Sequence, residues 1–318
     1  MTHFDVFNGD ADGICALVQL RLATPIESVL ITGAKREIAL LQCVEGRQGD
    51  EVTALDISVA VNREALLSLL ARGVTVEYFD HHFAGELPKH AGLKAHIDTS
   101  PGVCTGILVD RYLTGRHRIW AVVAAFGDNL ASVAQQLAHP LALDPEEVTG
   151  LRELGENLTY NAYGDSDADL IVHPSVLYLS LLQRGDPFHF MQTEPLFGQI
   201  SEARRRDLGL AQQTKPDMVL PGAAVYVLPD APWSRRVRGV FGNELANHSP
   251  KLAHAILTPN AKGGYTVSVR APLARSIGAD QLCREFATGG GRSAAAGIDH
   301  LPADQVPDFV RRLDKAFP

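Results

Sequence analysis

Cysteine is scarce in this 318-residue chain, which has four thiols and no C-x-x-C pair. Cys15, Cys43 and Cys104 lie in apolar stretches, which is typical of reduced core thiols rather than of a disulfide framework. Because disulfides persist mainly in oxidising compartments, this pattern leads us to expect a cytoplasmic protein.

Long hydrophobic runs are missing as well. The longest apolar stretches are of strand length or are broken by charge, so we expect no transmembrane helix. The N-terminus has no basic segment followed by an apolar one, and no signal peptide is predicted. Internal repeats and low-complexity segments are also lacking. The hydrophobic content of 46% and charged content of 21% are typical of a soluble globular protein, and the length suffices for two domains.

Positive charge is deficient in the first part of the chain. Residues 1–198 hold 13 Lys and Arg against 26 Asp and Glu, whereas residues 199–318 hold 16 against 11. An acidic part beside a basic part suits a site where carboxylates hold cations and arginines receive phosphate, although two solvated charged faces would give the same counts. The overall charge of −8 argues against broad binding to long duplex DNA.

What the sequence does contain is a regular alternation of short apolar runs and helical patterns. This alternation predicts an α/β fold with a parallel sheet and helices on both faces. Strands are expected at Phe4–Phe7, Ser28–Thr32, Val52–Leu55 and Val74–Phe79, and helices near Gly13–Ala23, Glu37–Val44 and Asn62–Ala71. Residues 105–182 are predicted to be mostly helical.

A break at Arg184–Pro187 and a charged helical pattern from about Leu196 to Gln213 divide the chain. We expect a first domain over residues 1–190, a connector helix over residues 191–215 and a smaller α+β domain over residues 216–318. The elements expected in the second domain are strands at Ala223–Leu228, Val237–Phe241, Ala253–Thr258 and Tyr265–Arg270, a hairpin turn at Gly263-Gly264, and helices near Asn243–Asn247, Ala279–Ala287 and Val306–Phe317.

Acidic residues follow three predicted strands of the first domain. Asp10 and Asp12 follow the first strand, Asp56 the third, and Asp80-His81-His82 the fourth. Since neighbouring parallel strands lie about 4.8 Å apart, these side chains can converge on one crevice, where carboxylates repel one another unless cations or protons neutralise them. Bound divalent metal is the economical solution, with the aspartates bridging two ions. The mixed ligands suit manganese, while magnesium, zinc and iron(II) are further candidates.

Each of these residues also has a purely structural interpretation. Asp and Gly are common in turns, Asp56 could cap a following helix, and Asp128 could cap the helix expected from Leu130. Their joint placement at strand ends is what favours a functional site.

The second domain holds a different signal, in which Gly289, Gly290 and Gly291 precede Arg292 and a run of small residues. We predict that the glycines lead into a helix N-terminus, where bare backbone N–H groups bind an anion and Arg292 adds a bidentate contact. Arg270, at the end of a strand in the same domain, offers a second guanidinium for that anion.

Taken together, the motifs resemble those of the DHH phosphoesterase superfamily with a C-terminal DHHA1 domain, which includes RecJ-type exonucleases and nanoRNases. The resemblance extends over nearly the whole chain and is carried by Asn8–Gly13, Asp56, Asp80-His81-His82, Gly127-Asp128 and Gly289–Arg292. It implies a metal-dependent phosphoesterase with one or two Mn²⁺ ions, or Mg²⁺ or another divalent metal in their place. The implied substrate is a nucleotide phosphate ester or a short single-stranded oligonucleotide, attacked by a metal-activated water. The resemblance leaves open whether the protein forms a homodimer.

The resemblance also implies roles for single residues in an active-site cleft. Asp10 would hold one metal and Asp12 the other, with Asp56 bridging the two ions. His81 and Asp128 would complete the shell of the second metal.

Substrate handling is implied in the same way. His82 would contact the scissile phosphate or assist the leaving group, while Asp80 would orient His81 or the site. The glycine loop and Arg270 would grip the nucleotide or a terminal phosphate.

Three positions depart from the family pattern. Many relatives have a metal-binding histidine where this chain has Val6, and some have one where it has Asn8, whose carbonyl oxygen is a weaker ligand. The first metal would then be held weakly, or one ion alone would be held firmly. Arg292 stands where the common loop has histidine, and arginine binds phosphate without acting as a general acid or base.

Two alternative functions remain open at this stage. One is a non-catalytic nucleotide-binding protein, and the other is an inorganic pyrophosphatase or polyphosphatase. The glycine loop and the S-x-R at Ser268 and Arg270 look more like the nucleotide-processing branch.

Overall fold

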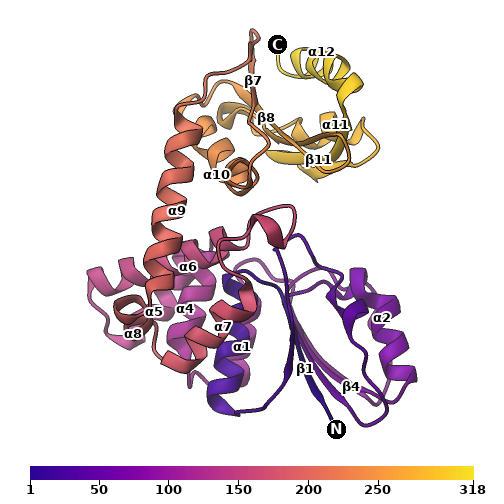
Figure 1. The fold of residues 1–318 in the computed structure, drawn as a ribbon, viewed down its shortest axis with the longest axis vertical. Helices are drawn as coiled ribbons and strands as arrows, with labels where there is room; N and C mark the ends of the chain where they lie inside the picture. Colours follow the sequence, from indigo (N-terminus) through magenta and orange to yellow (C-terminus); the bar gives the residue numbers. More distant parts are fainter. The chain divides into compact units, whose positions relative to one another are not determined.

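The structure, a computed structural model, describes residues 1–318, which form two compact units over residues 1–202 and 203–318 (Figure 1). The division falls within helix α9 (Pro195–Gln212), which is the helix expected from about Leu196 to Gln213. Each unit has its own sheet and its own apolar core.

The first unit is built on a five-stranded sheet in the order β2-β1-β3-β4-β5, with every neighbouring pair parallel. Its strands are β1 (His3–Phe7), β2 (Val29–Ile31), β3 (Glu51–Leu55), β4 (Thr75–Asp80) and β5 (Leu93–Ile97). The predicted parallel sheet is confirmed, while β5 was missed because its burial is only intermediate along the strand. The strand order reverses between β1 and β3, and open α/β sheets bind ligands outside the carboxyl ends of the strands at such a reversal.

Helices cover both faces of this sheet, as predicted. In Figure 1, α1 (Ala11–Ala23) and α2 (Val59–Ala71) lie on opposite sides of β1 and β4. The other helices of the unit are η1 (Leu40–Cys43), α3 (Thr105–Tyr112), α4 (Arg118–Gly127), α5 (Ala131–Ala138), η2 (His139–Leu141), α6 (Pro145–Asn161), η3 (Asp167–Asp169), α7 (Pro174–Arg184) and α8 (Pro187–Thr193).

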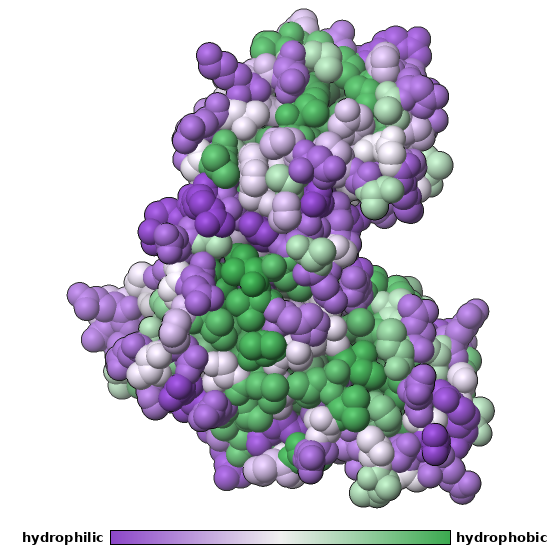
Figure 2. All heavy atoms as spheres, in the orientation of Figure 1, coloured by the Kyte–Doolittle hydropathy of each residue, from purple (hydrophilic) through white to green (hydrophobic).

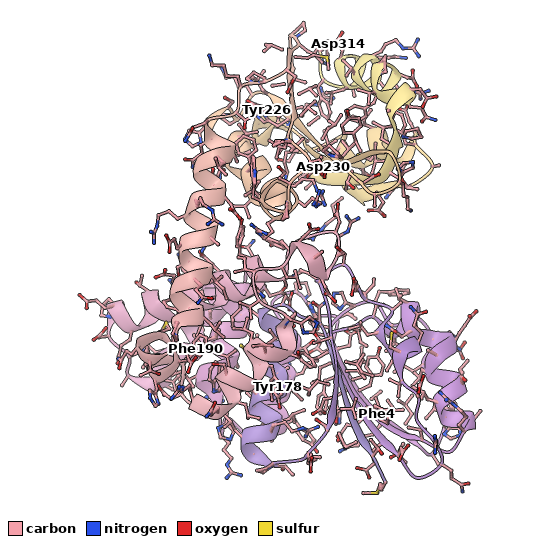
Figure 3. All side chains as sticks on the ribbon, viewed as in Figure 1. Phe4, Tyr178, Phe190, Tyr226, Asp230 and Asp314 are labelled. Atoms are coloured by element: carbon pink, nitrogen blue, oxygen red, sulfur yellow. The ribbon has the colours of Figure 1, made fainter.

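Alternation along β1 divides the core of the first unit into two clusters. Phe7 packs in the larger cluster, on the side of α1 and the helical segment, with Tyr178 and Phe190. Phe4 and Val6 pack in the smaller cluster with residues of α2. Figure 3 labels Phe4 on one side and Tyr178 and Phe190 on the other. Val6 is fully buried, so this strand position serves packing.

The second unit is an α+β fold with a six-stranded mixed sheet in the order β10-β11-β9-β8-β7-β6. Its strands are β6 (Met218–Val219), β7 (Ala223–Val227), β8 (Ala253–Pro259), β9 (Gly264–Arg270), β10 (Gly289–Arg292) and β11 (Ala295–Pro302). Its helices are α10 (Pro232–His248), η4 (Leu273–Arg275), α11 (Ala279–Arg284), η5 (Ala303–Gln305) and α12 (Val306–Ala316). The predicted hairpin is confirmed, because β8 and β9 pair antiparallel and Gly263 has a φ of 79°.

Two predictions for this unit were wrong. Val237–Phe241 is not a strand but lies inside α10, where the buried positions Ser234, Val237 and Phe241 recur at helical spacing. The glycine run does not lead into a helix, because Gly289–Arg292 is β10 and pairs with β11 in an antiparallel hairpin. The fully buried side chains of β11 pack in the core only if this segment is extended alongside β9.

The surface of the first unit carries several large apolar side chains (Figure 2), among them Val176 and Leu179 on α7, which are 51% and 54% exposed. The structure contains no helix with both the length and the hydrophobicity that crossing a bilayer demands. Apolar atoms form a large part of any protein surface, whereas buried carboxylates need an explanation. Several buried carboxylates follow the strand ends of the first unit, where the fold predicts a ligand site.

Close helix packing beneath these strand ends depends on glycine. A Cβ added at Gly127 would lie 2.3 Å from Cβ of Ala11 and 2.9 Å from the carbonyl oxygen of Gly155, so α1, α4 and α6 meet there without room for a side chain. We expect Gly127→Ala to lower the free energy of unfolding by about 1–3 kcal/mol through overpacking. Urea denaturation followed by circular dichroism measures this loss.

The matched control is Gly198→Ala in α9, where an added Cβ has nothing within 4 Å. Alanine in a helix is about 1 kcal/mol more favourable than glycine, so this variant is expected to keep or raise stability. Equal losses in the two variants would contradict the packing argument.

Candidate metal centre

The register of the parallel sheet brings three polar positions to one level. Phe7 pairs with Leu55, and Leu55 with Phe79, so the residues that follow each strand leave the sheet side by side. The ladder continues for one step, because the Asn8 N–H donates to the Leu55 carbonyl at 3.1 Å and the Asp56 N–H donates to the Phe79 carbonyl at 3.0 Å. Asn8, Asp56 and Asp80 are all buried.

Asp10 caps the N-terminus of α1. Its Oδ1 accepts hydrogen bonds from the backbone N–H groups of Asp12 (3.0 Å) and Gly13 (3.2 Å). Glycine is required at position 13, since a Cβ there would lie 2.2 Å from the Asn8 carbonyl oxygen. Asp10 therefore has a structural role as a helix cap, while its Oδ2 faces a cation, Lys35.

Asp12 is fixed by the N-terminus of a different helix. Its two carboxylate oxygens accept from the backbone N–H groups of Thr105 and Gly106, each at 2.7 Å. These donors begin α3, whose N-terminal dipole favours a negative charge. Asp12 therefore presents its carboxylate in one orientation beside the same strand ends.

Asp56 lies at the centre of the cluster. Its backbone has a φ of 58°, a left-handed conformation that Asp and Asn tolerate better than most residues. Its Oδ1 accepts from the Thr105 hydroxyl at 3.2 Å and lies 3.3 Å from Nε2 of His81. The same Nε2 lies 3.8 Å from Oδ2 of Asp12. Asp56, His81 and His82 each offer one potential metal-ligand atom, and these three atoms lie within 4.8 Å of one another, as a metal site requires.

Asp80 holds His82 rather than His81. Its Oδ1 lies 2.7 Å from Nδ1 of His82, and this hydrogen bond raises the pKa of the imidazole. The second oxygen, Oδ2, is buried without a hydrogen-bond partner. Such an acceptor is costly unless a proton or cation meets it, so the site fits a bound cation.

Asp128 joins the cluster from the C-terminus of α4, where it is partly buried. Burial, followed by the charges of Asp12 and Asp10, raises its pKa to about 6. The same three causes raise the pKa of Asp56 well above the ordinary value. The helix that follows Asp128 has Leu130 at its N-cap and the helix after Asp56 has Ser58, so neither aspartate is the predicted cap.

Lys35 was missed by the sequence analysis. Its ammonium pairs with Oδ2 of Asp10, and its side chain is 34% exposed. Burial alone would raise the pKa of Asp10, but the Lys35 charge and hydrogen bond hold that pKa below its ordinary value. Asn8 lies beside this pair: its Oδ1 accepts from the Asp10 N–H at 3.2 Å and its Nδ2 donates to the Lys35 carbonyl at 3.4 Å. A lone lysine 25 residues beyond Asp10 gave no local signal.

In the second unit, the sheet places two arginines in one row. Arg292 of β10 pairs with Ala295 of β11, which pairs with Arg270 of β9, so their side chains emerge on the same face. The Arg270 guanidinium is anchored by Asn243 (2.7 Å), by Ser268 (2.9 Å) and by the Gly239 carbonyl (3.1 Å). Arg292 is exposed, and its row partner Ala295 is small.

The glycines beside Arg292 are shaped by the hairpin. Gly291 has a φ of 136°, and a Cβ there would lie 2.5 Å from Cα of Ala296. At Gly289 a Cβ would lie 1.6 Å from the Cys283 carbonyl oxygen, whereas Gly290 has nothing within 4 Å. These glycines therefore permit a tight hairpin rather than a helix N-terminus.

No protein-family profile and no curated protein sequence matches the chain. Solved structures do match. A crystal structure of exonuclease RecJ bound to manganese superposes with a TM-score of 0.65 at 18% identity, covering 100% of this chain and 91% of that one. RecJ from Thermus thermophilus in complex with Mn²⁺ gives 0.63 at 16% identity, with 100% and 52% covered. CDC45 from Entamoeba histolytica gives 0.50 at 11% identity, with 99% and 95% covered.

These similarities establish that the chain has the RecJ fold. It spans nearly the whole of the first RecJ structure and about half of the Thermus thermophilus chain. The α/β architecture expected from the motifs is thereby confirmed.

The raised pKa of Asp128 predicts a pH dependence of stability. Because the folded state holds this proton more tightly than the unfolded state, whose pKa is near 3.8, stability falls as the pH rises from about 4 to about 6. Asp128→Asn removes the group. In metal-free protein we expect its free energy of unfolding, relative to the parent, to rise by up to about 3 kcal/mol between pH 4 and pH 7. Urea denaturation with EDTA at both pH values tests this, and a constant difference would contradict it.

Proposed function

We propose that this protein is a divalent-metal-dependent phosphohydrolase that cleaves phosphate esters of nucleotides or of short single-stranded oligonucleotides. The observation that carries the proposal is the convergence of Asp12, Asp56 and His81 at the strand-order reversal of a RecJ fold. Manganese is the favoured cation, because the donors combine carboxylate and imidazole and two of the matched RecJ structures hold it. Magnesium is the alternative.

The residues that would hold the cation are Asp12, Asp56, His81 and Asp128. A divalent cation there supplies Lewis-acid stabilisation of the phosphoryl oxygens and lowers the pKa of water. The chain contributes the preorganisation: the backbone N–H groups at the start of α3 fix Asp12, and the Thr105 hydroxyl fixes Asp56.

His82 is the candidate proton donor. Its Nδ1 is held by Asp80, which leaves Nε2 as the ring nitrogen available to a substrate, and its side chain is 46% exposed. The carboxylate raises its pKa, so the imidazolium persists closer to neutral pH and can deliver a proton to the leaving oxygen. Asp80 acts through His82 as a positioning residue.

The second unit supports binding of the substrate's phosphates. Arg270 and Arg292 share one row of the sheet, two strands apart, so their Cα atoms are separated by about 10 Å. Two long guanidinium side chains at this spacing can hold one phosphate between them or two successive phosphates of a chain. The bare backbone at Gly290 leaves room for the ligand to approach.

The proposal is tested by Asp56→Asn. Asparagine has nearly the same shape and tolerates the left-handed backbone, so the variant is expected to fold normally. Because the central carboxylate is lost, we expect hydrolysis to fall at least about 100-fold. The assay is a panel with Mn²⁺: phosphoadenosine phosphate, dinucleotides, cyclic dinucleotides, short RNA, single-stranded DNA and pyrophosphate.

Glu64→Gln on the exposed surface of α2 removes the same charge away from the cluster and serves as the control. Full activity of a folded Asp56→Asn protein would contradict the proposed mechanism. Absence of both turnover and metal binding in the parent protein would favour a non-catalytic binding protein, and fastest turnover of pyrophosphate would move the substrate class to inorganic phosphates.

Arg292→Ala tests the role of the second unit. We expect the KM for an oligonucleotide to rise about 5- to 100-fold with little change in kcat, because a phosphate contact made equally in the ground and transition states is lost. Arg284→Ala, an exposed arginine of α11, is the control. An unchanged KM would show that Arg292 does not bind the substrate.

A further inference from the structure

The carboxylate cluster of the first unit is divided into two halves by the nitrogen-bearing side chains that face it. On the side of β4, Asp12 and Asp56 face the imidazole of His81. On the side of β2, Asp10 faces the ammonium of Lys35. Asp10 is 2% exposed, so its charge is buried and its partner matters for stability.

Lys35 is held in place by its backbone. Its N–H donates to the Ala162 carbonyl at 2.9 Å, and its own carbonyl accepts from Nδ2 of Asn8. The preceding residue, Ala34, donates its N–H to Oδ1 of Asp167 at 3.2 Å. The loop after β2 is thus tied both to the strand end and to the helical segment, so the ammonium is positioned by the fold rather than by a freely rotating surface side chain.

Glycine at position 9 lets this loop approach the cluster. A Cβ at Gly9 would lie 2.1 Å from the carbonyl oxygen of Gly33, so a side chain at position 9 would push the loop away. Gly9 immediately precedes Asp10, and Gly33 lies two residues before Lys35. The backbone contact therefore sets the lysine against the aspartate.

The half of the cluster that contains Asp10 has no imidazole that could bind a second metal ion. Val6 packs in the core with α2, and both polar atoms of the Asn8 side chain already have backbone partners. A second ion about 3.5–4 Å from the first would have to take Oδ2 of Asp10, which Lys35 holds. Binding such an ion would displace the Lys35 ammonium, and few other ligand atoms are available there to hold the ion.

We propose that Lys35 takes the place of a second metal ion, so that the centre binds one divalent cation and uses the lysine ammonium as its second positive charge. The inference deepens the proposed function and rests on it. Since the Lys35 side chain is 34% exposed while paired with Asp10, a phosphoryl oxygen of the substrate can approach it from solvent. Unlike an exchangeable ion, this charge is always present.

The test counts manganese ions without measuring activity. The full chain is titrated with Mn²⁺ and studied by calorimetry and by electron paramagnetic resonance. We expect one ion per chain in the parent protein, with the six-line spectrum of an isolated Mn²⁺. Lys35→Met keeps the aliphatic stem but removes the charge, which frees Asp10. This variant is expected to bind two ions and to show the multiline spectrum of a spin-coupled pair.

Lys35→Arg keeps the charge and is expected to bind one ion, like the parent. Lys94→Met is the matched control, because Lys94 pairs with Glu77 and is 59% exposed, and it is also expected to leave the count at one. Two ions in the parent protein, or one in a folded Lys35→Met protein, would overturn the inference about Lys35. Binding of no ion by the parent would instead overturn the proposed function, so the two failures are distinguishable.

Discussion

Burial of negative charge at the carboxyl ends of β1, β3 and β4 is the constraint on which the rest of the first unit depends. Asp10, Asp12, Asp56 and Asp80 are each no more than 2% exposed. Water cannot solvate these carboxylates, so the fold must do so. It uses two helix N-termini, at α1 and α3, and one lysine from the loop after β2. Asp56 and Asp128 are left with raised pKa values, and this residual charge is what a metal ion would neutralise.

The glycines of the first unit follow from the same constraint. Gly13 and Gly106 lie where a helix N-terminus must approach a carboxylate or a neighbouring helix, and a Cβ at Gly106 would lie 2.5 Å from Cβ of Ala124. Gly9 lets the lysine loop approach. Solvating buried charge by backbone groups demands short distances, and these distances exclude side chains.

The sequence predicted the parts of this arrangement that have a local pattern. Apolar runs alternating with helical patterns predicted the parallel sheet, and the acidic residues after each run identified the strand ends. The β10–β11 hairpin was not predictable from Ala294, Ala295 and Ala296, since alanine favours a helix locally and pairing with β9 overrides that preference. Lys35 was not predictable because nothing in its neighbourhood links it to Asp10. Its role arises from a contact between two glycines that are 24 positions apart in the sequence, Gly9 and Gly33.

The left-handed backbone of Asp56 has an evolutionary consequence. Most residues are strained at a φ of 58°, but asparagine is not, and the codons of aspartate and asparagine differ by one base. A single point mutation could thus yield a gene copy that keeps this fold and its binding surfaces while losing the central carboxylate. Such a copy would be free to evolve as a binding protein. Under the proposed function, the identity of residue 56, more than likeness of fold, would separate hydrolytic members of a lineage from members that only bind.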